Sequence, residues 1–332
     1  GEGSPTAFQY PNFTNTSGLL LNGSATVSAG NLLLARSGGV NEASAVWGRG
    51  QYNVSGGFDS RFRFRISDLV NGGADGLAFV IQKPGVTERG EAGSGLGYRG
   101  IGSFLAIEFD TVASADVAAN DPAGNDNHID IRLRSPSATP TAGTSLARTA
   151  AGEIPDLSDG REHEVRVRYD GTQLSVFLDD MTTPRLTVTV NLDTALGLTQ
   201  GLAYAGLTGA TGAGASQRAE IASWSFQADQ PAAAGNDTFA TAQYVGNLLT
   251  SDQNTISVAG TVASATDIDW YVLDLNYEQI QAIAGVNNGL KTWSTVFDID
   301  YADGFRGDLT LSVFDSQGRL LYMGRDSNVA AE

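Results

Sequence analysis

The chain has 332 residues, a length typical of two domains, with 41 glycines, no cysteine and a formal net charge of −17. The missing cysteine excludes disulfides, thiolate chemistry and cysteine-ligated zinc or iron–sulfur centres. The acidic balance argues against nucleic acid and anionic membranes as partners, because both attract a basic surface. No apolar run is long enough to span a bilayer, so we expect no membrane insertion.

An acidic, cysteine-free chain rich in Gly, Thr, Ser and Asn is typical of exported bacterial surface proteins. We therefore expect a secreted or cell-surface location. The sequence begins at Gly1 rather than Met, which fits the removal of a leader peptide.

Alternation with a period of two dominates the first 228 residues and predicts antiparallel strands. The stretch "FDSRFRFRIS" has one apolar and one charged face, made respectively of Phe58, Phe62, Phe64, Ile66 and of Asp59, Arg61, Arg63, Arg65. The stretch "HEVRVRYDGTQLSVFLDD" predicts a hairpin that turns at Asp170-Gly171, and "LTVTVNL" and "AEIASWSF" predict further strands. Short strands with Gly-rich turns, and no convincing amphipathic helix before residue 230, predict an all-β sandwich or barrel.

One loop, in "FLAIEFDTVASADVAANDPAGNDNHIDIRL", concentrates oxygen ligands and a histidine. Glu108 and Asp110 share a face of the strand that leads into the loop, and the loop returns Asp121 and His128. Carboxylates around one point repel each other, and a divalent cation relieves the repulsion. Oxygen ligands suit Ca²⁺, and a histidine among carboxylates suits Mn²⁺. Two adjacent ions that share both aspartates would use all four side chains.

Two other interpretations of this loop stay open. It can be a solvated acidic turn with a structural histidine, since Asp, Asn and Gly are turn residues. A Glu-x-Asp strand also resembles the start of the laminarinase-type glucanase motif, in which a further Glu follows on the same face. Val112 and Ala113 hold those positions here, and His163 has no evident Ser or Asp partner, so we expect no enzyme activity.

Four motifs in order give a wider resemblance. They are "FQYPNF…SGLLLNGSATVSAGNLLLARSG", "GGADGLAFVIQ", "AIEFDT…NDP…NHIDI" and "YAGLTGATGAGASQRAEIASWSF", and they extend from about Ala7 to Gln227. Together they resemble the L-type (legume-type) lectins and their bacterial relatives. The resemblance implies a concanavalin-like jelly roll that binds Ca²⁺, with a second ion that is Mn²⁺ or Ca²⁺, and takes glycans or polysaccharide as its partners.

The resemblance also implies metal ligands. The transition-ion ligands would be Glu108, Asp110, Asp121 and His128, and the calcium ligands would include Asp110, Asp121 and the Val112 carbonyl. The family's calcium-binding asparagine falls at Ser114 or Asp116 in this sequence. Asn120 is a substitute from a shifted position, and further candidates are Asn125 and Asn127.

For the sugar, the resemblance implies Asp75 as the central acceptor, preceded by a cis peptide bond after Ala74. An ionised carboxylate can accept two sugar hydroxyl groups; the alternative for Asp75 is a turn aspartate beside Gly76. The other implied contacts are backbone N–H groups at Gly95, Gly97, Gly212 and Ala213, and the side chain of Asn120 as the substitute for the family's asparagine. Tyr98 would add a stacking face, because sugar C–H groups pack on aromatic rings; the alternative for the segment of Gly95 and Gly97 is a flexible loop.

After a predicted linker at 229–236, residues 237–332 resemble a pre-peptidase C-terminal domain, through "NDTFATAQYVG", "VAGTVASATDIDWYVLDL" and "GDLTLSVFDSQGRLL". We expect a second small β-sandwich that lacks its usual last strands. Asp267 and Asp269 either bind calcium there or flank the start of a strand.

Taken together, the sequence predicts a secreted, calcium-dependent carbohydrate-binding lectin or adhesin, with residues 1–228 as the lectin-like sandwich. The alternative is a structural subunit of an extracellular filament, layer or matrix that keeps the fold without binding sugar. A glucanase or an accessory part of a secreted hydrolase is a weaker alternative. Exposed sheet edges also allow self-association.

Overall fold

A computed structural model describes residues 7–114, 124–136, 138, 143–231, 236–249, 256, 258–259, 264, 266–275, 295, 297 and 310–325. The chain divides into two compact units: Gly1–Ala232 with Thr250–Gly260, and Ala233–Leu249 with Thr261–Glu332. No helix in these described residues is long and apolar enough to cross a membrane.

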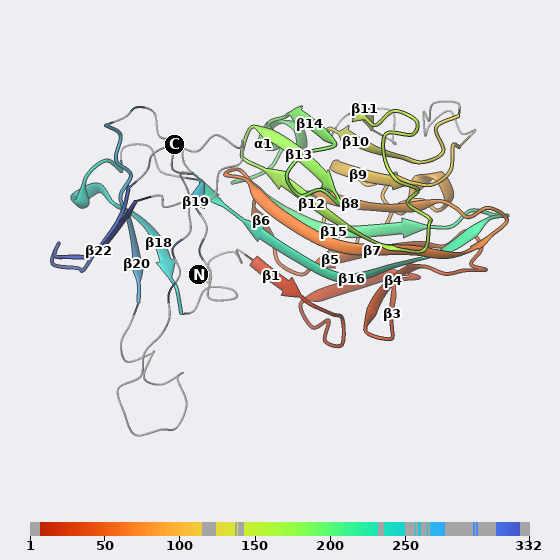
Figure 1. Cartoon of the computed structure of the whole chain (residues 1–332), viewed down its shortest axis with the longest axis horizontal. Helices are drawn as coiled ribbons and strands as arrows, with labels where there is room; N and C mark the ends of the chain where they lie inside the picture. The colour runs from red at the N-terminus through yellow and green to blue at the C-terminus, as the bar shows by residue number, and fades with distance from the viewer. Residues whose placement is uncertain are drawn as a thin grey trace, which may run out of the picture. The chain divides into compact units, whose positions relative to one another are not determined.

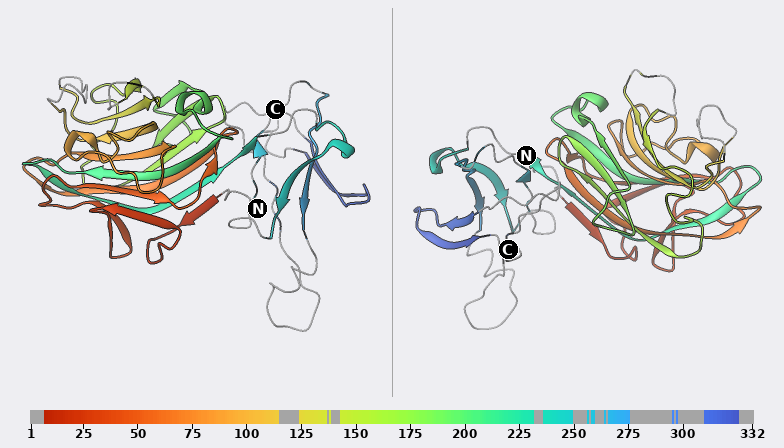
Figure 2. Two further views of the ribbon diagram at one scale, coloured as in Figure 1. Left: turned by 180° about the vertical axis from the view of Figure 1, so that it is seen from behind. Right: turned by 45° about the horizontal axis from the view of Figure 1, so that its top comes forward.

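The first unit is a sandwich of two antiparallel sheets, which can be followed in Figures 1 and 2. The first sheet has the order β14-β13-β12-β7-β16-β4-β3, and β1 also pairs with β16. Its strands are β1 (Ala7–Tyr10), β3 (Thr26–Ser28), β4 (Asn31–Ala35), β7 (Phe58–Val70), β12 (Glu162–Tyr169), β13 (Gln173–Leu178), β14 (Leu186–Thr189) and β16 (Ser216–Ala228).

The second sheet has the order β11-β10-β9-β8-β15-β5-β2, and β6 also pairs with β15. Its strands are β2 (Leu19–Gly23), β5 (Ala43–Gly48), β6 (Tyr52–Asn53), β8 (Gly76–Gln82), β9 (Phe104–Asp110), β10 (His128–Arg134), β11 (Thr144–Arg148) and β15 (Leu202–Ala210). This arrangement confirms the predicted all-β antiparallel sandwich.

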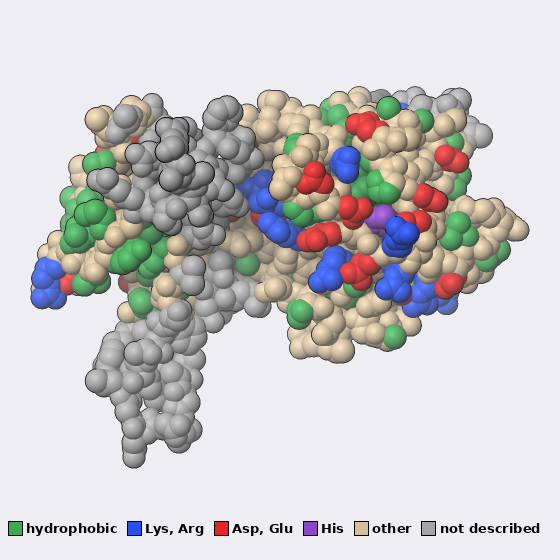
Figure 3. All heavy atoms as spheres, in the orientation of Figure 1, with side chains coloured by type: hydrophobic (Ala, Val, Ile, Leu, Met, Phe, Trp, Pro, Cys, Tyr) green, Lys and Arg blue, Asp and Glu red, His purple; other side chains and the backbone are tan. Residues whose placement is uncertain are grey.

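The alternation of apolar and charged side chains decides which side of the first sheet faces the core. Along β7 every second side chain from Phe58 to Ile66 is buried, whereas Arg61, Arg63 and Arg65 are exposed. The predicted hairpin is confirmed as β12 and β13, with Val165 opposite Leu178 and Tyr169 opposite Leu174. Figure 3 shows basic and acidic side chains interspersed on the outer side of this sheet.

The strands β5, β8 and β9 of the second sheet are buried on both faces, which the sequence did not indicate. One face contributes Ile107, Phe109 and Ile129 to the core between the sheets. A loop that includes η1 (Gly93–Gly95) packs Leu96 and Tyr98 on the other face, with Trp47, Val80, Ile101 and Phe104 in the same cluster. Residues on β9 that would otherwise face solvent therefore lie beneath a loop.

One short helix was not predicted. The helix α1 (Leu192–Leu196) begins after Asn191, whose side chain accepts a hydrogen bond from the Thr194 amide, and ends at Gly197 in the left-handed region. Five residues are too few for a helical period to show in the sequence.

The last strands of the first unit are β17 (Gln230–Pro231) and β19 (Val258–Ala259), which pair in parallel. In the second unit, β18 (Gln243–Asn247) follows η2 (Phe239–Thr241) and pairs in parallel with β20 (Tyr271–Asp274). The strands β21 (Thr310–Phe314) and β22 (Leu320–Arg325) form an antiparallel hairpin. The second sandwich and its domain boundaries stay predictions.

Candidate functional site

Asp75 lies at the point where the chain enters β8. The peptide bond between Ala74 and Asp75 is cis, as the resemblance implied. The Asp75 amide donates to the Ala210 carbonyl (3.1 Å), and its own carbonyl accepts from both the amide and the hydroxyl of Thr111 (3.0 Å each). The backbone of Asp75 is therefore held by β15 on one side and by the end of β9 on the other.

A glutamine on β16 supports this arrangement from behind. The Nε2 atom of Gln217 donates to the Thr111 hydroxyl at 2.8 Å, and the Gln217 side chain is fully buried. A chain of hydrogen bonds thus runs from Gln217 through Thr111 to the Asp75 carbonyl. Gln217 could not be predicted from the sequence, because an isolated glutamine in a strand is part of no motif.

Two glycine-containing loops come close to the Asp75 carboxylate, which is only 8% exposed. A Cβ atom added to Gly212 would lie 3.3 Å from Asp75 Oδ2, and one added to Gly93 would lie 4.0 Å from it. The Gly93 amide donates to the Thr211 carbonyl (3.1 Å), and the Asn41 amide donates to the Gly212 carbonyl (3.0 Å). Gly212 therefore lies beside Asp75, as a sugar-binding loop would; the role of the exposed Ala213 next to it stays a prediction.

Three expected sugar contacts in the loop over the second sheet need correction. The Tyr98 ring is 1% exposed and packs edge-on against Phe104, so it offers no stacking face to a sugar. The Gly95 amide donates to the Ala92 carbonyl (3.2 Å), and the Gly97 amide donates to the Glu91 carbonyl (2.9 Å). Both amide groups are used within the loop, because the loop must satisfy its own backbone where it packs against the sheet.

Glu108, Asp110 and His128 come together as the sequence predicted. In the register of β9 and β10, Asp110 lies opposite His128, and Glu108 lies opposite Asp130, so these side chains share one face. All four are buried. The carboxylate of Asp110 accepts a hydrogen bond from the Val112 amide (2.8 Å), which turns the chain at the end of β9.

His128 has the orientation of a metal-binding histidine. Its Nδ1 atom lies 3.1 Å from the Asn125 carbonyl, and we assign the ring proton to Nδ1 because a carbonyl can only accept. The Nε2 atom is then the acceptor of the ring. A backbone carbonyl that fixes the tautomer in this way is a common support for histidine ligands.

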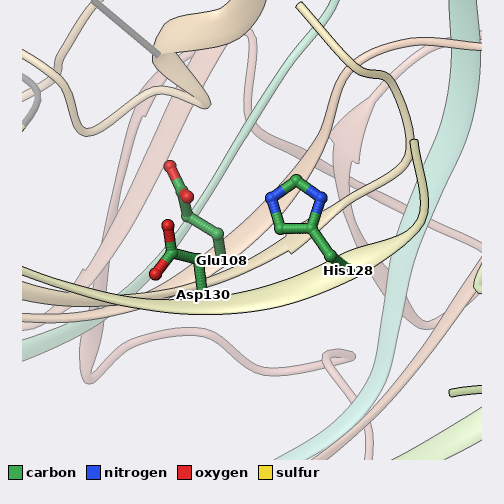
Figure 4. A group of neighbouring side chains, drawn as sticks. All are labelled: Glu108, His128 and Asp130. Atoms are coloured by element: carbon green, nitrogen blue, oxygen red, sulfur yellow. The ribbon is translucent and has the colours of Figure 1, made fainter. Parts of the chain in front are cut away.

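Among the described residues, the one group with metal-like spacing is Glu108, His128 and Asp130, whose ligand atoms lie within 4.8 Å of one another (Figure 4). Asp130 was not predicted as a member. Three of the expected ligands, Asp116, Asn120 and Asp121, lie outside the described residues.

Asp130 is already surrounded by hydrogen-bond donors. Its Oδ1 atom accepts from the Ser145 hydroxyl (2.6 Å). Its Oδ2 atom accepts from Arg148 Nη2 (2.6 Å) and Arg132 Nη1 (3.2 Å). The carboxylate is part of a buried ion-pair network, and this network, rather than a metal ion, accounts for its position.

Glu108 has two partners of its own. The Tyr98 hydroxyl donates to Glu108 Oε1, and Arg132 Nη1 lies 3.8 Å from Glu108 Oε2. Burial, and then the negative charge of Glu108, raise the pKa of Tyr98 well above its ordinary value, so the phenol stays a donor.

The resemblance implies two ions, and these contacts suit one of them and not the other. For calcium, the described residues offer Asp110, a buried carboxylate at the end of β9 whose oxygen binds the Val112 amide, and carboxylate oxygens suit Ca²⁺. The transition ion does not fit, because Glu108 faces a guanidinium and a phenol donor.

The weaker metal candidates have other partners. The Asn125 amide group donates to the Thr149 carbonyl (3.0 Å). The Asn127 side chain donates to the Pro155 carbonyl (2.8 Å) and accepts from the Leu157 amide (2.9 Å). Both side chains are therefore used in hydrogen bonds to backbone groups. Ser114, the remaining candidate among the described residues, follows β9 and is partly buried.

Asp267 and Asp269 precede β20 and do not form a metal-like group in the described part of the second unit. Partial burial and the neighbouring charge of Asp267 raise the pKa of Asp269. The pair lies just before the start of β20, and whether it also binds calcium stays a prediction.

Comparisons with known proteins agree with this geometry. A family model described as "Legume lectin domain" matches residues 5–240. The fold is similar to that of the winged bean acidic lectin complexed with methyl-alpha-D-galactose, with 25% identity, a TM-score of 0.54, and coverage of 66% of this chain and 96% of that chain.

Two further solved structures share the fold. The lectin from Bauhinia forficata in complex with GalNAc is 24% identical, with a TM-score of 0.55 and coverage of 68% of this chain and 98% of that one. The metal-free form of lectin I-B4 from Griffonia simplicifolia is 23% identical, with a TM-score of 0.54 and coverage of 67% and 98%.

Proposed function

The chain belongs to the legume lectin domain family, and from this premise we propose that it is a calcium-dependent carbohydrate-binding protein whose sugar site is built around Asp75. The observation that carries the proposal is the position of the Asp75 carboxylate, held by backbone hydrogen bonds to two strands and approached by Gly212 and Gly93.

The chemistry of the site suits sugar hydroxyl groups. An ionised carboxylate accepts two hydrogen bonds, and bonds to a charged partner are the stronger kind. Glycine at position 212 leaves space beside Asp75 that any larger side chain would fill. Sugar would bind at Asp75 as the acceptor, with backbone groups of the Gly212 loop around it.

Calcium would support this site from the neighbouring strand. Asp110 and the Val112 carbonyl would hold the ion, and the residue between them, Thr111, bonds to the Asp75 carbonyl. The ion would supply positive charge to buried carboxylates. Thr111 couples the conformation of the calcium-binding turn to the backbone of Asp75.

Catalysis has little support at this site. Members of the family bind carbohydrate without converting it. A retaining glycosidase needs a second carboxylate about 5 Å from the first, and the candidate pair here places Glu108 against Arg132 and Tyr98. We propose a location outside the cell, on a bacterial surface or secreted from it, on the grounds of the acidic, cysteine-free composition.

A glycan array with calcium, and again with a chelator, tests the proposal. Galactose and GalNAc are the first probes, because similar lectins were solved with them. We expect Asp75→Asn to weaken binding about 10- to 100-fold, the equivalent of about 1.5–3 kcal/mol for a hydrogen bond to a charged group. Asp68→Asn is the matched control, since Asp68 is exposed.

Binding that is lost with the chelator and in Asp75→Asn, but kept in Asp68→Asn, would support the proposal. No calcium-dependent binding to any glycan would overturn it, and the fold would then act as the building block of an extracellular structure.

A further inference from the structure

Arg132 is a buried cation within the cluster that should hold the transition ion. It lies on β10, opposite Ala106 on β9, and is 1% exposed. The side chains of Arg132, Asp130 and Glu108 share one face of the sheet, because their positions in the two strands differ by steps of two. A charge buried this deeply requires opposite charges around it.

The partners of Arg132 are the carboxylates that a metal ion would otherwise bring together. Its Nη1 atom lies 3.2 Å from Asp130 Oδ2 and 3.8 Å from Glu108 Oε2. Its Nη2 atom donates to the Gly143 carbonyl (3.2 Å), which fixes the plane of the guanidinium. Arg132 therefore joins Glu108 to Asp130 as a divalent ion would.

The balance of charge leaves room for one divalent ion. The buried cluster holds three carboxylates (Glu108, Asp110 and Asp130), and two guanidiniums, Arg132 and Arg148, bond to Asp130. Among the described residues of the cluster, the excess is therefore one negative charge, which one divalent ion is enough to balance. Two divalent ions would place four positive charges beside the buried Arg132 and the partly buried Arg148, and like charges repel strongly in a poorly solvated interior.

The position along the strand decides which ion is displaced. The backbone of Arg132 lies opposite Ala106, two residues from Glu108 and four residues from Asp110 along β9. The guanidinium reaches Glu108, where it is within ion-pair distance of the carboxylate. It therefore repels an ion at Glu108 more than one at Asp110.

We propose that Arg132 takes the place of the transition ion at Glu108, so that this chain binds one divalent cation, at Asp110, where the family resemblance implies two. The proposal rests on the calcium site of the proposed function. It assigns Glu108 to an internal ion pair and leaves calcium as the cation that supports the sugar site.

Metal stoichiometry of the full chain is the direct test. The protein is stripped with a chelator, equilibrated with both Ca²⁺ and Mn²⁺, freed of unbound metal and measured by elemental mass spectrometry. We expect one divalent ion per chain. Two ions per chain would overturn the replacement by Arg132 and leave the calcium site standing, whereas no bound ion would overturn both.

Three variants test the role of Arg132 in this stoichiometry. Arg132→Gln removes the internal cation, and we expect the number of bound ions to rise from one to two, with the second visible as protein-bound Mn²⁺ by electron paramagnetic resonance. Arg148→Gln is the matched control, because Arg148 bonds to Asp130 and has no ion pair with Glu108 among the described residues; it should keep one ion.

Glu108→Gln keeps the test decisive where Arg132→Gln fails to fold. If Glu108 is no metal ligand, its neutral variant should bind calcium within about 3-fold of the wild-type affinity. A loss of 10-fold or more in calcium affinity would overturn the proposal.

Discussion

For single residues, the proposed sugar site depends on side chains that support the backbone of Asp75. Asp75 would be the acceptor, but its backbone is positioned by Thr111, and Thr111 is positioned by Gln217. Such supporting hydrogen bonds commonly decide whether a binding group is held in the right place.

We expect Gln217→Leu to weaken glycan binding about 5- to 10-fold, the equivalent of about 1 kcal/mol for one hydrogen bond, at saturating calcium. Isothermal titration with the best glycan of the array measures the affinity, and calcium titration of the same variant separates sugar binding from metal binding. Gln227→Leu is the control, because Gln227 lies on the same strand but opposite Asp59 and Ala7. Wild-type sugar affinity in Gln217→Leu would rule out the positioning role.

Among the strands, β7 has an apolar face that packs in the core and a charged face that is exposed to solvent. Its phenylalanines fill the core between the sheets, where Phe62 lies edge-on to Phe109 with ring centroids 5.7 Å apart. Its arginines form ion pairs in solvent, such as the one between Arg63 and Glu162 (2.9 Å). The buried phenylalanine face contributes most of the stability, because burying apolar surface is worth more than an exposed ion pair.

We therefore expect Phe62→Ala to lower the free energy of unfolding of the first unit by about 3–5 kcal/mol, because it leaves a cavity in a fully packed core. Arg63→Ala should lower it by at most about 1 kcal/mol, since its ion pair is exposed and screened by salt. Urea unfolding of both variants measures the difference. Similar losses in the two would contradict the assignment of the faces.

The strand β9 shows why the loop above it matters. Its outward side chains would face water in an open sandwich, but Leu96 and Tyr98 pack over this face of the second sheet. Glu108 consequently lies in a poorly solvated environment in which charge must be balanced locally. Because this loop covers the strand, Glu108 is buried rather than exposed to solvent.

At the scale of the whole molecule, calcium should stabilise the first unit because it binds the folded form and not the unfolded chain. At a calcium concentration of about 100 times the dissociation constant, the gain is about 2.7 kcal/mol. For a unit of this size, that corresponds to a rise in melting temperature of about 5–10 °C.

Scanning calorimetry of the full chain, with calcium and again with a chelator, measures this rise in melting temperature. Because the chain has two units, each unfolding transition is assigned to its unit before the shift is read. Asp110→Asn should abolish most of the calcium-dependent shift, whereas Asp267→Asn should leave it unchanged. A shift that survives in Asp110→Asn would place the ion elsewhere.

The amino-acid sequence alone was enough to predict the alternation of β7 and the hairpin of β12 and β13, because each depends on residues that are close in the chain. The period of two along a strand also placed Glu108 and Asp110 on one face. The interest in Asp75 and the cis peptide before it came from the resemblance of four motifs, in order, to the lectin family.

What surrounds those residues depends on the folded structure. The register of β9 against β10 brings Asp130 opposite Glu108, with Arg132 two residues further along β10. The packing of the loop before β9 against the sheet brings Tyr98 to the same carboxylate. Gln217 reaches Thr111 from 106 positions away in the chain. No local pattern records such contacts, because they depend on which strands become neighbours when the sheets close over the core.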